Sequence, residues 1–388
     1  MVTRRAVLTT GTASILVLGA AAHQMTNAES NATFRAPWEE AAKGFGDVRL
    51  NALAYAILAP NPHNRQPWKV MLHDDGFSCT LYCDLQRLLP ETDPQNRQIT
   101  IGLGAFLELY KLAAAKQGYG VNINSFPEGE NAIGLDERPI ATFTLEQNTA
   151  IDQNPLFDHV LSRRTIRSKF DLDRSPSEED LAQLIETAEI TKVVQFASTT
   201  NTEQIGRLKD VCKRGWKVET STLKTHHEST ALTRIGSKEV SENPDGISLL
   251  GPLFEVTRSL GILSRDKMNQ PGSIAADGAV SFYNTLIDSA AVFGWISTPT
   301  NTRRDQLDAG AAWVRLNLAA TKLGIAMHPL SQVLQEFPEM GNLYNEFHDE
   351  VKITTPARVQ GLFRFGFAGA PKAAPRWPLA SRLTGSTT

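Results

Sequence analysis

Two short segments carry the residues best suited to chemistry. The first is "LAPNPHNRQPWKV", which runs from Leu58 to Val70 and gathers Asn61, Pro62, His63, Asn64 and Gln66 in one connection. The second is "RRTIRSKF", which places Arg163, Arg164 and Arg167 around Thr165. Guanidinium groups offer fixed pairs of donors that match phosphate oxygens, so the second segment could cradle a phosphate. Taken alone, each segment is also compatible with an ordinary polar turn.

An internal repeat organises the chain around these two segments. "NRQITIGLGAFLELYKLAAAKQGY" from Asn96 aligns with "TRRDQLDAGAAWVRLNLAATKLGI" from Thr302 at a constant offset of 206 residues. The offset pairs Arg97 with Arg303, Gly104 with Gly310 and Ala105 with Ala311. We therefore expect two copies of one α+β unit. The first half spans residues 36–155 and the second half spans residues 156–388.

The elements of each half follow from the hydrophobic spacing. We expect helices near 50–58, over 93–118 and after a capping box in which Ser175 is the N-cap and Glu178 closes the box. We expect strands at 68–73, around Cys79, and at 138–148, 192–199 and 358–369. A lid-like insertion of about 205–280 interrupts the second half, with a turn at Asn243-Pro244-Asp245-Gly246.

Composition excludes several classes of partner. The net charge of −3 and the ordinary hydrophobic content of 41% argue against nucleic acid. Cys79, Cys83 and Cys212 are too few for a disulfide framework, and we expect buried thiols. The adjacent histidines His226 and His227 would point apart on a helix, so we expect no metal site.

The N-terminal residues 1–28 have the pattern of an export signal. Arg4 and Arg5 precede a short uncharged apolar run, and cleavage could follow Ala22 or Ala28. The paired arginines resemble a twin-arginine signal, which implies that the chain is exported already folded by the twin-arginine translocase. We expect a periplasmic or other extracytoplasmic location.

Together the two polar segments resemble the nitroreductase-like flavin family. In that family an Arg-x-Ser/Thr-x-Lys/Arg turn holds the FMN phosphate, and an Asn-x-Gln-Pro-Trp loop reaches the flavin from the other subunit of a dimer. Here the loop lies at Pro60–Trp68 and the phosphate turn at Arg163–Arg167. The arrangement is similar to the tandem, Acg-like branch, in which one chain mimics the dimer. The resemblance implies antiparallel-dominated sheets flanked by helices, a monomeric pseudo-dimer and one FMN per chain.

The resemblance also implies roles for individual residues. The residues that would contact FMN are Asn61, Pro62, His63, Asn64, Gln66, Arg163, Arg164, Thr165, Arg167, Pro329, Leu330, Ser331, Gln332 and Arg376. Arg167 would stabilise negative charge on the reduced flavin, while the flavin itself performs the chemistry. The acidic residue that the family carries near the flavin N5 is absent, with Ser331 or Gln332 in that region.

Two functions follow from the resemblance and stay open at this point. The first is an FMN-dependent oxidoreductase that passes a hydride from an unknown donor to a small electron-poor acceptor. The second is a catalytically weak protein that sequesters FMN beneath the 205–280 insertion. The large insertion and the absent acidic residue favour the second.

Overall fold

The computed structural model describes residues 33–148, 150–190 and 192–385. The expected export signal, residues 1–28, lies outside this part of the chain. No helix in the described ranges is both long and apolar enough to span a bilayer.

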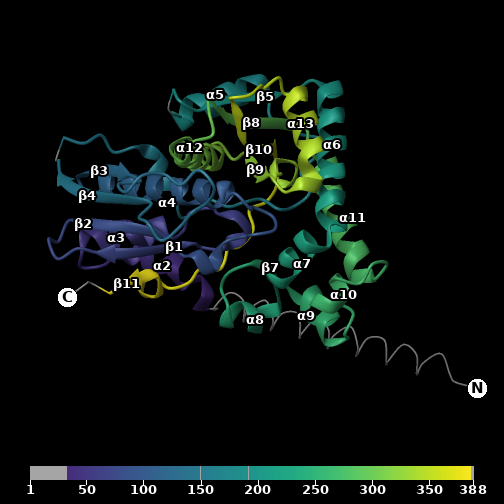
Figure 1. Ribbon diagram of the computed structural model, residues 1–388, viewed down its shortest axis with the longest axis horizontal. Helices are drawn as coiled ribbons and strands as arrows, with labels where there is room; N and C mark the ends of the chain where they lie inside the picture. Colours follow the sequence, from purple (N-terminus) through teal and green to yellow (C-terminus); the bar gives the residue numbers. More distant parts are fainter. Residues whose placement is uncertain (1–32, 149, 191, 386–388) are drawn as a thin grey trace, which may run out of the picture.

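Two sheets form the framework of the molecule (Figure 1). The five-stranded sheet has the order β11 (Leu383–Thr384), β1 (Trp68–Leu72), β2 (Ser78–Cys83), β4 (Ala141–Gln147) and β3 (Tyr119–Ser125). The four-stranded sheet has the order β5 (Gln195–Thr199), β8 (Val292–Thr298), β10 (Arg358–Gly366) and β9 (Ala326–Pro329). All neighbours in these two sheets are antiparallel except β1 and β11. The expected α+β class with antiparallel-dominated sheets is confirmed.

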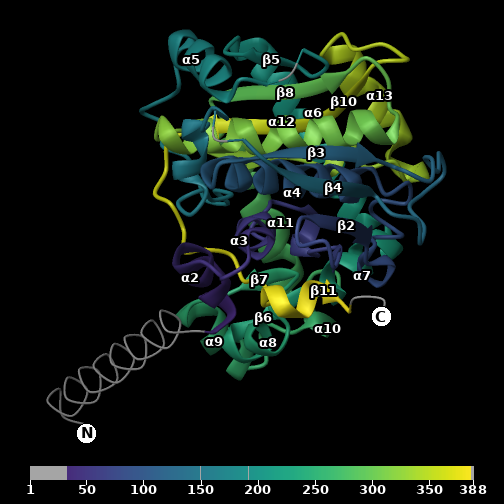
Figure 2. The same cartoon turned by 90° about the vertical axis from the view of Figure 1, so that its left-hand side faces the viewer.

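The two repeated segments form two long helices that pack against each other. α4 covers Arg97–Lys116 and α12 covers Arg303–Lys322, so both ends of the helices keep the 206-residue offset. Figures 1 and 2 show the pair side by side in the middle of the molecule. A Cβ atom added to Gly104 would lie 2.1 Å from the Leu307 carbonyl oxygen, and one added to Gly310 would lie 2.0 Å from the Ile101 carbonyl oxygen. The repeated glycines therefore allow direct backbone contact at the crossing.

Shorter elements complete the framework. The remaining α-helices outside the insertion are α2 (Ala36–Lys43), α3 (Val48–Ala56), α5 (Glu178–Ala188) and α13 (Gly341–Glu350). Single turns of 3-10 helix are η1 (Thr33–Arg35), η2 (Pro62–Asn64), η3 (Leu85–Arg87), η4 (Pro155–His159), η5 (Gln332–Leu334), η6 (Pro338–Met340) and η7 (Leu379–Arg382).

The expected start of α5 is wrong by two residues. Ser177 is the N-cap and forms the capping box with Asp180, whereas we expected Ser175 and Glu178. The sequence contains both Ser-x-x-acid spacings, and the second one is used.

The insertion is a mostly helical lobe. Its elements are α6 (Thr202–Ser221), α7 (Leu223–Ala231), β6 (Thr233–Ile235), α8 (Gly236–Glu242), β7 (Ile247–Leu249), α9 (Pro252–Ser259), α10 (Arg265–Met268) and α11 (Ile274–Asp288). In Figure 2 the part from α8 to α10 lies below α2 and β11, so the lobe extends from the second sheet toward the first.

Buried apolar side chains form two large clusters, one beside each sheet. A large apolar cluster joins the first sheet, α4 and α12, and a second cluster lies between α6, α11, α13 and the second sheet. Cys79, Cys83 and Cys212 are free and buried, which confirms that they are packing residues.

The helix crossing gives a first testable prediction. We expect Gly104→Ala and Gly310→Ala each to lower the free energy of unfolding by at least about 2 kcal/mol, because the new methyl group meets a backbone carbonyl. Urea unfolding followed by circular dichroism measures the effect.

Gly206 provides the matched control because it lies in α6, where an added Cβ atom would have nothing within 4 Å. Gly206→Ala should raise the free energy of unfolding by roughly 0.5–1 kcal/mol through helix propensity alone. Equal stability of all three variants would contradict the close crossing.

Candidate functional site

The loop that follows α3 is held in a rare backbone conformation. His63, Asn64 and Gln66 have positive φ angles of 46°, 51° and 51°. The Asn61 side-chain oxygen accepts a hydrogen bond from the Gln66 backbone N–H at 2.7 Å, which closes the loop on itself. Left-handed conformations are costly for residues other than glycine, so the surrounding contacts must hold this loop in place.

Two distant segments supply those contacts. Asn64 donates to the Pro375 carbonyl at 3.0 Å, and the Gln66 side-chain oxygen accepts from the Trp377 backbone N–H at 2.9 Å. Gln66 also donates to the Pro244 carbonyl at 2.7 Å, and it is fully buried. The C-terminal segment and the turn of the insertion therefore both fix the loop.

Arg376 lies beneath the loop, where it satisfies the end of α3. Its five N–H groups donate to the carbonyl oxygens of Ile57, Leu58, Ala59 and Pro375 and to the Asn64 side chain. The carbonyls of Ile57, Leu58 and Ala59 follow the end of α3, where carbonyl groups have no partner within the helix. The whole guanidinium is thus committed to protein groups, and it orients Asn64 at 2.6 Å.

Arg163 and Arg164 also use most of their guanidinium nitrogens in hydrogen bonds within the protein. Arg163 is buried and donates to Asn317 at 2.8 Å and to the Leu58 carbonyl at 3.0 Å, and burial lowers its pKa to about 9. Its Nε is buried without a partner in the described structure. Arg164 donates to nearby carbonyls, with its guanidinium 4.9 Å from the ring centre of Trp38.

Arg167 is the arginine of the phosphate turn whose charge is not used in contacts within the described part of the protein. It is exposed and makes no hydrogen bond or ion pair within the described residues, while Thr165 beside it is half-buried. Burial is the main reason that the pKa of His63 falls to about 4, and the positive charge of Arg167 lowers it further. The pKa of His328 is also lowered by burial, by Arg364 and by Arg167. Hydrogen bonds join these segments: the Ile166 backbone N–H donates to the Met327 carbonyl of β9 at 3.1 Å, and Arg163 donates to the Leu58 carbonyl before the loop at 3.0 Å. The charge of Arg167 therefore acts on both the loop and β9.

The predicted segment after β9 lies on the same side. Leu330 is buried and its backbone N–H donates to the Leu362 carbonyl at 2.8 Å, which continues the sheet beyond Pro329. Ser331 precedes η5, and the Gln332 side-chain oxygen accepts a hydrogen bond from the Tyr283 hydroxyl at 2.8 Å.

Sequence reasoning missed three residues of this region, namely Glu219, Tyr283 and His328. The Tyr283 ring lies 6.2 Å from His328 in an edge-on arrangement. The His328 Nδ1 accepts from Arg364 at 3.0 Å, so the neutral ring carries its proton on Nε2. Glu219 and Tyr283 come from helices of the insertion, and no spacing in the sequence indicates that they contact Gln335 and Gln332.

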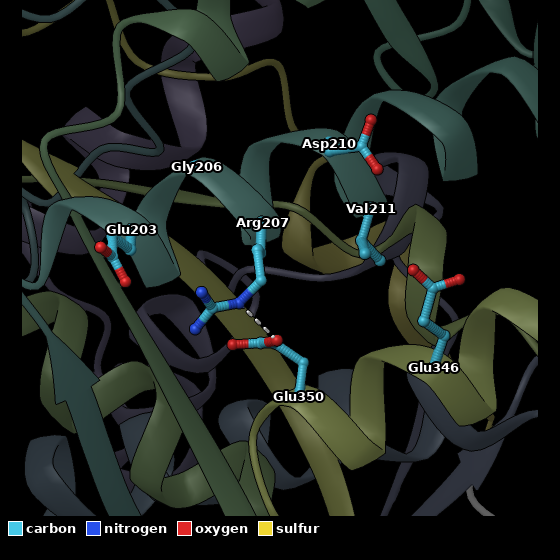
Figure 3. Close-up of a pocket in the computed structure, with 7 residues that line it drawn as sticks. All are labelled: Glu203, Gly206, Arg207, Asp210, Val211, Glu346 and Glu350. Atoms are coloured by element: carbon cyan, nitrogen blue, oxygen red, sulfur yellow. Dashed lines mark hydrogen bonds and ion pairs between the residues drawn. The ribbon is translucent and has the colours of Figure 1, made fainter.

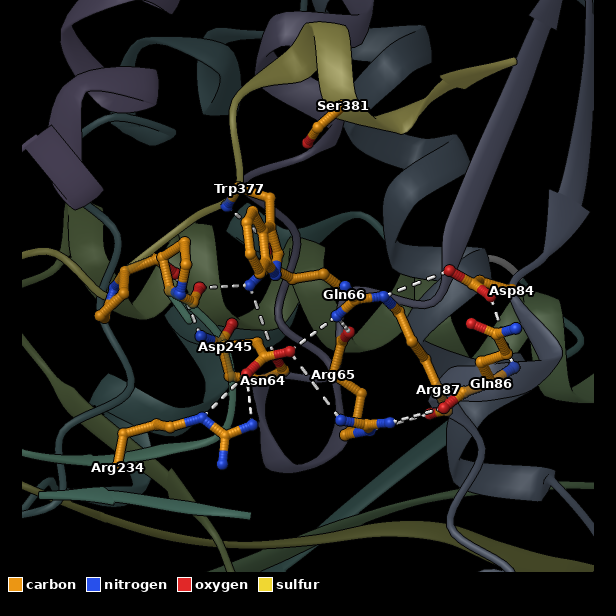
Figure 4. Close-up of polar contacts among 12 residues, drawn as sticks. Asn64, Arg65, Gln66, Asp84, Gln86, Arg87, Arg234, Asp245, Trp377 and Ser381 are labelled. Atoms are coloured by element: carbon orange, nitrogen blue, oxygen red, sulfur yellow. Dashed lines mark hydrogen bonds and ion pairs between the residues drawn. The ribbon is translucent and has the colours of Figure 1, made fainter. Parts of the chain in front are cut away.

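The turn of the insertion is the centre of a buried ion cluster (Figure 4). One carboxylate oxygen of Asp245 accepts two hydrogen bonds from Arg234, at 2.8 Å and 3.2 Å. The other oxygen accepts a hydrogen bond from Arg87 at 2.7 Å and forms an ion pair with Arg65 at 3.9 Å. The Gly246 backbone N–H donates to the Asn64 carbonyl at 3.3 Å. Burial raises the pKa of Asp245, but Arg234 and Arg87 outweigh this effect and keep it below its usual value. This cluster joins the insertion to the strained loop.

A surface depression elsewhere contains none of the predicted site residues (Figure 3). It has a volume of about 520 Å³ and lies between α6 and α13, where Arg207 pairs with Glu350 at 2.8 Å. Most of its charged side chains are acidic, namely Glu203, Asp210, Glu346 and Glu350. We do not assign the candidate site to it.

Comparison with known proteins shows which family this chain belongs to. The sequence model of the nitroreductase family matches residues 160–367, which is more than half of the chain. The chain is 25% identical over 341 residues to an uncharacterized protein of Mycobacterium tuberculosis H37Rv, covering 86% of this chain and 92% of that protein. It is 32% identical over 140 residues to a protein of the same organism that is by name a putative NAD(P)H nitroreductase, Acg, covering 35% of this chain and 39% of that protein.

Two solved structures resemble part of this chain. The FMN-dependent nitroreductase NfnB from Mycobacterium smegmatis, solved in complex with NADPH, is 19% identical, with a TM-score of 0.35 over 57% of this chain and 92% of its own. An iodotyrosine deiodinase bound to FMN and 3-iodo-L-tyrosine is 16% identical, with a TM-score of 0.33 over 57% of this chain and 94% of its own.

The Asp245 cluster gives a second prediction. Asp245→Asn removes the only carboxylate that Arg234 and Arg65 approach among the described ion pairs, whereas Arg87 keeps Asp84. We expect the free energy of unfolding to fall by about 3–5 kcal/mol. We also expect faster hydrogen exchange in residues 233–249 and in the loop at 61–66.

Asp210→Asn is the control, because Asp210 is exposed and pairs with Arg214 on the surface. It should change stability by less than about 1 kcal/mol. Unchanged hydrogen exchange at 61–66 in Asp245→Asn would show that the cluster does not hold the loop.

Proposed function

Because this chain belongs to the nitroreductase family, we propose that it binds FMN and acts as an FMN-dependent oxidoreductase. The hydrogen bonds that join the phosphate turn to β9 and to the start of the strained loop, with Arg167 exposed between them in the sequence, are the observation that carries this proposal. When bound, FMN would supply hydride transfer from a donor to a small electron-poor acceptor. The protein would supply position and positive charge.

The polar groups of the region suit an anionic, polar cofactor. The His63 Nδ1, the Arg163 Nε and the Ser168 hydroxyl are buried without a partner in the described structure. Buried polar groups in native proteins are nearly always paired, so three such atoms in the loop and in or beside the phosphate turn fit a polar ligand. A phosphate and a heteroaromatic ring with several carbonyl and N–H groups would pair them.

Each predicted contact has a role in this proposal. Arg163, Arg164 and Thr165 would hold the phosphate and ribityl chain, and Arg167 would lie at the pyrimidine edge, where it stabilises negative charge. The loop residues Asn61 to Gln66 and the segment Pro329 to Gln332 would line the ring from opposite halves. Arg376, whose donors are all committed to the protein, would act by orienting Asn64.

The proposal extends to the organisation of the chain. Since the loop occurs only in the first half and the phosphate turn only in the second, one chain would bind one FMN as a monomeric pseudo-dimer. The contact between the repeated helices α4 and α12 supports this arrangement. The Arg4-Arg5 segment supports export through the twin-arginine translocase to the periplasm.

An FMN-sequestering protein is the second candidate function. The buried Asp245 cluster favours it, since it clamps the insertion onto the loop that would line the flavin. Addition of NADH or NADPH to the purified flavoprotein separates the two candidates. Rapid bleaching of the visible flavin absorbance supports the oxidoreductase, and a persistent yellow colour with both donors supports sequestration.

FMN binding itself is the third prediction. Isothermal titration calorimetry of purified protein should give one FMN per chain. Arg167→Ala should weaken binding at least about tenfold, because a charge-assisted contact is worth roughly 1.5–3 kcal/mol. Arg207→Ala, which alters an exposed arginine paired only with Glu350 among the described ion pairs, should leave binding unchanged. Equal affinity of the two variants would remove Arg167 from the site.

A further inference from the structure

Trp38 lies among three arginines of the candidate site. It belongs to α2, and its side chain is buried, with 7% of the residue exposed. The guanidinium carbons of Arg164, Arg376 and Arg163 lie 4.9, 5.7 and 6.0 Å from the centre of its ring. An aromatic face attracts a cation over such distances, and the attraction is stronger where water is excluded. The ring therefore acts on three cations at once.

These three arginines have no carboxylate partner among the ion pairs of the described chain. Their N–H groups donate to backbone carbonyls and to the amide side chains of Asn317 and Asn64. Arg163 and Arg376 are nevertheless buried, with 3% and 2% of each residue exposed. Buried arginines in proteins are normally paired with an anion, so the surroundings of Trp38 carry an excess of positive charge.

The arginines around Trp38 oppose one another. Burial, and to a smaller extent the charge of Arg164, lowers the pKa of Arg163 to about 9. Burial and the charges of Arg163 and Arg164 lower the pKa of Arg376 to about 9 as well. Both groups stay charged at neutral pH, so their repulsion has to be offset by the aromatic ring and, when it is bound, by an anionic ligand.

Hydrogen bonds to the C-terminal segment connect Trp38 with the phosphate turn. The Trp38 Nε1–H donates to the Ala374 carbonyl at 2.9 Å, which orients the ring. The Arg164 Nε donates to the Pro371 carbonyl of the same segment at 3.2 Å. The ring and the arginine beside it are thus held by one stretch of backbone.

We propose that Trp38 is a positioning residue that holds Arg163 and Arg164 for the flavin phosphate, and that it thereby makes the site prefer FMN to riboflavin, which lacks the phosphate. This inference rests on the proposed FMN site. It goes beyond that proposal because it gives α2, which contains no residue of the loop or of the phosphate turn, a part in the choice of ligand.

An aromatic ring suits this task better than a carboxylate. A carboxylate would accept the in-plane N–H groups of the arginines and would repel a phosphate. The ring stabilises positive charge through its face, so the charge stays available to an anion. The Arg163 Nε, buried without a partner in the described structure, is a donor that a phosphate oxygen could use. Arg376, whose N–H groups are all used within the protein, would contribute its charge only.

FMN and riboflavin are the probes for the test, because they differ only in the phosphate. The dissociation constant of each flavin is measured by quenching of flavin fluorescence, and circular dichroism checks that each variant is folded. The wild type should bind FMN at least about tenfold more tightly than riboflavin, as expected for one charge-assisted hydrogen bond.

Two substitutions of Trp38 separate the charge of the ring from its bulk. Trp38→Leu keeps an apolar side chain and removes the aromatic face. It should weaken FMN binding about two- to thirtyfold, the range expected for cation–π contacts, and leave riboflavin binding unchanged. Trp38→Phe keeps an aromatic face and should lose less of the preference for FMN than Trp38→Leu does.

Phe157→Leu is the matched control. The Phe157 ring also faces a cation, because the Lys116 Nζ lies 5.7 Å from its centre. Lys116, however, is already paired with Asp158 at 3.1 Å. The variant should therefore leave the ratio of the two dissociation constants unchanged, and a loss as large as that of Trp38→Leu would contradict the specific role of Trp38.

The outcomes distinguish this inference from the proposed function. A wild type that binds neither flavin overturns the proposed function. A wild type that binds both flavins equally, or a Trp38→Leu variant that loses affinity for both to the same extent, overturns the role of Trp38 and leaves flavin binding intact. Equal FMN affinity of Trp38→Leu and Trp38→Phe also overturns it, because packing alone would then explain the loss.

A variant that keeps the shape of the side chain covers the case in which Trp38→Leu does not fold. A tryptophan with a fluorinated indole ring is incorporated at position 38, since fluorine withdraws electron density from the face of the ring and changes its size little. FMN binding should weaken while riboflavin binding stays the same. An unchanged affinity for FMN would overturn the inference.

Discussion

The contact between α4 and α12 is the constraint on which the rest of the structure depends. Gly104 and Gly310 bring the backbones of the two helices together, and any side chain at either position would overlap a carbonyl oxygen. This close approach places the first sheet and the second sheet on opposite sides of one helix pair. The loop after α3 and the end of β9 can therefore reach the same region, although they lie in different halves of the chain.

Buried arginines then fix the parts that the helix pair brings together. Arg376 satisfies the end of α3 and orients Asn64, Arg163 joins Leu58 to Asn317 on α12, and Arg364 sets the tautomer of His328. Each buried guanidinium donates mainly to neutral oxygens or nitrogens, so burial lowers the pKa of all three. Arg167 differs because it is exposed and unpaired within the described chain, which leaves its charge available to a ligand.

The sequence predicted the framework better than the site. The 206-residue repeat located α4 and α12, and hydrophobic alternation located β1, β2, β4, β5 and β10, because both signals arise from burial of regular faces. Alternation did not locate β3 or β8, and β8 is buried along its whole length, so it shows no alternation. The capping box of α5 was placed two residues early because two overlapping spacings satisfy the same rule. The loop and the phosphate turn were found as motifs, but the contacts of Glu219 and Tyr283 depend on how the insertion folds back onto η5. Long-range packing of that kind leaves no periodicity in the sequence.

The loop "LAPNPHNRQPWKV" illustrates why the insertion has to be considered part of the site. Three of its residues have left-handed backbone angles, and a loop of this kind is stable only when neighbouring groups hold it. Two of those neighbouring groups, Pro244 and Gly246, belong to the insertion, and the Asp245 carboxylate between them neutralises the arginines that flank the loop. A segment that only covered a finished site could be removed without changing the site beneath it. Here removal would release the loop on one side and Gln332 on the other, so the insertion and the candidate flavin site form one structural unit.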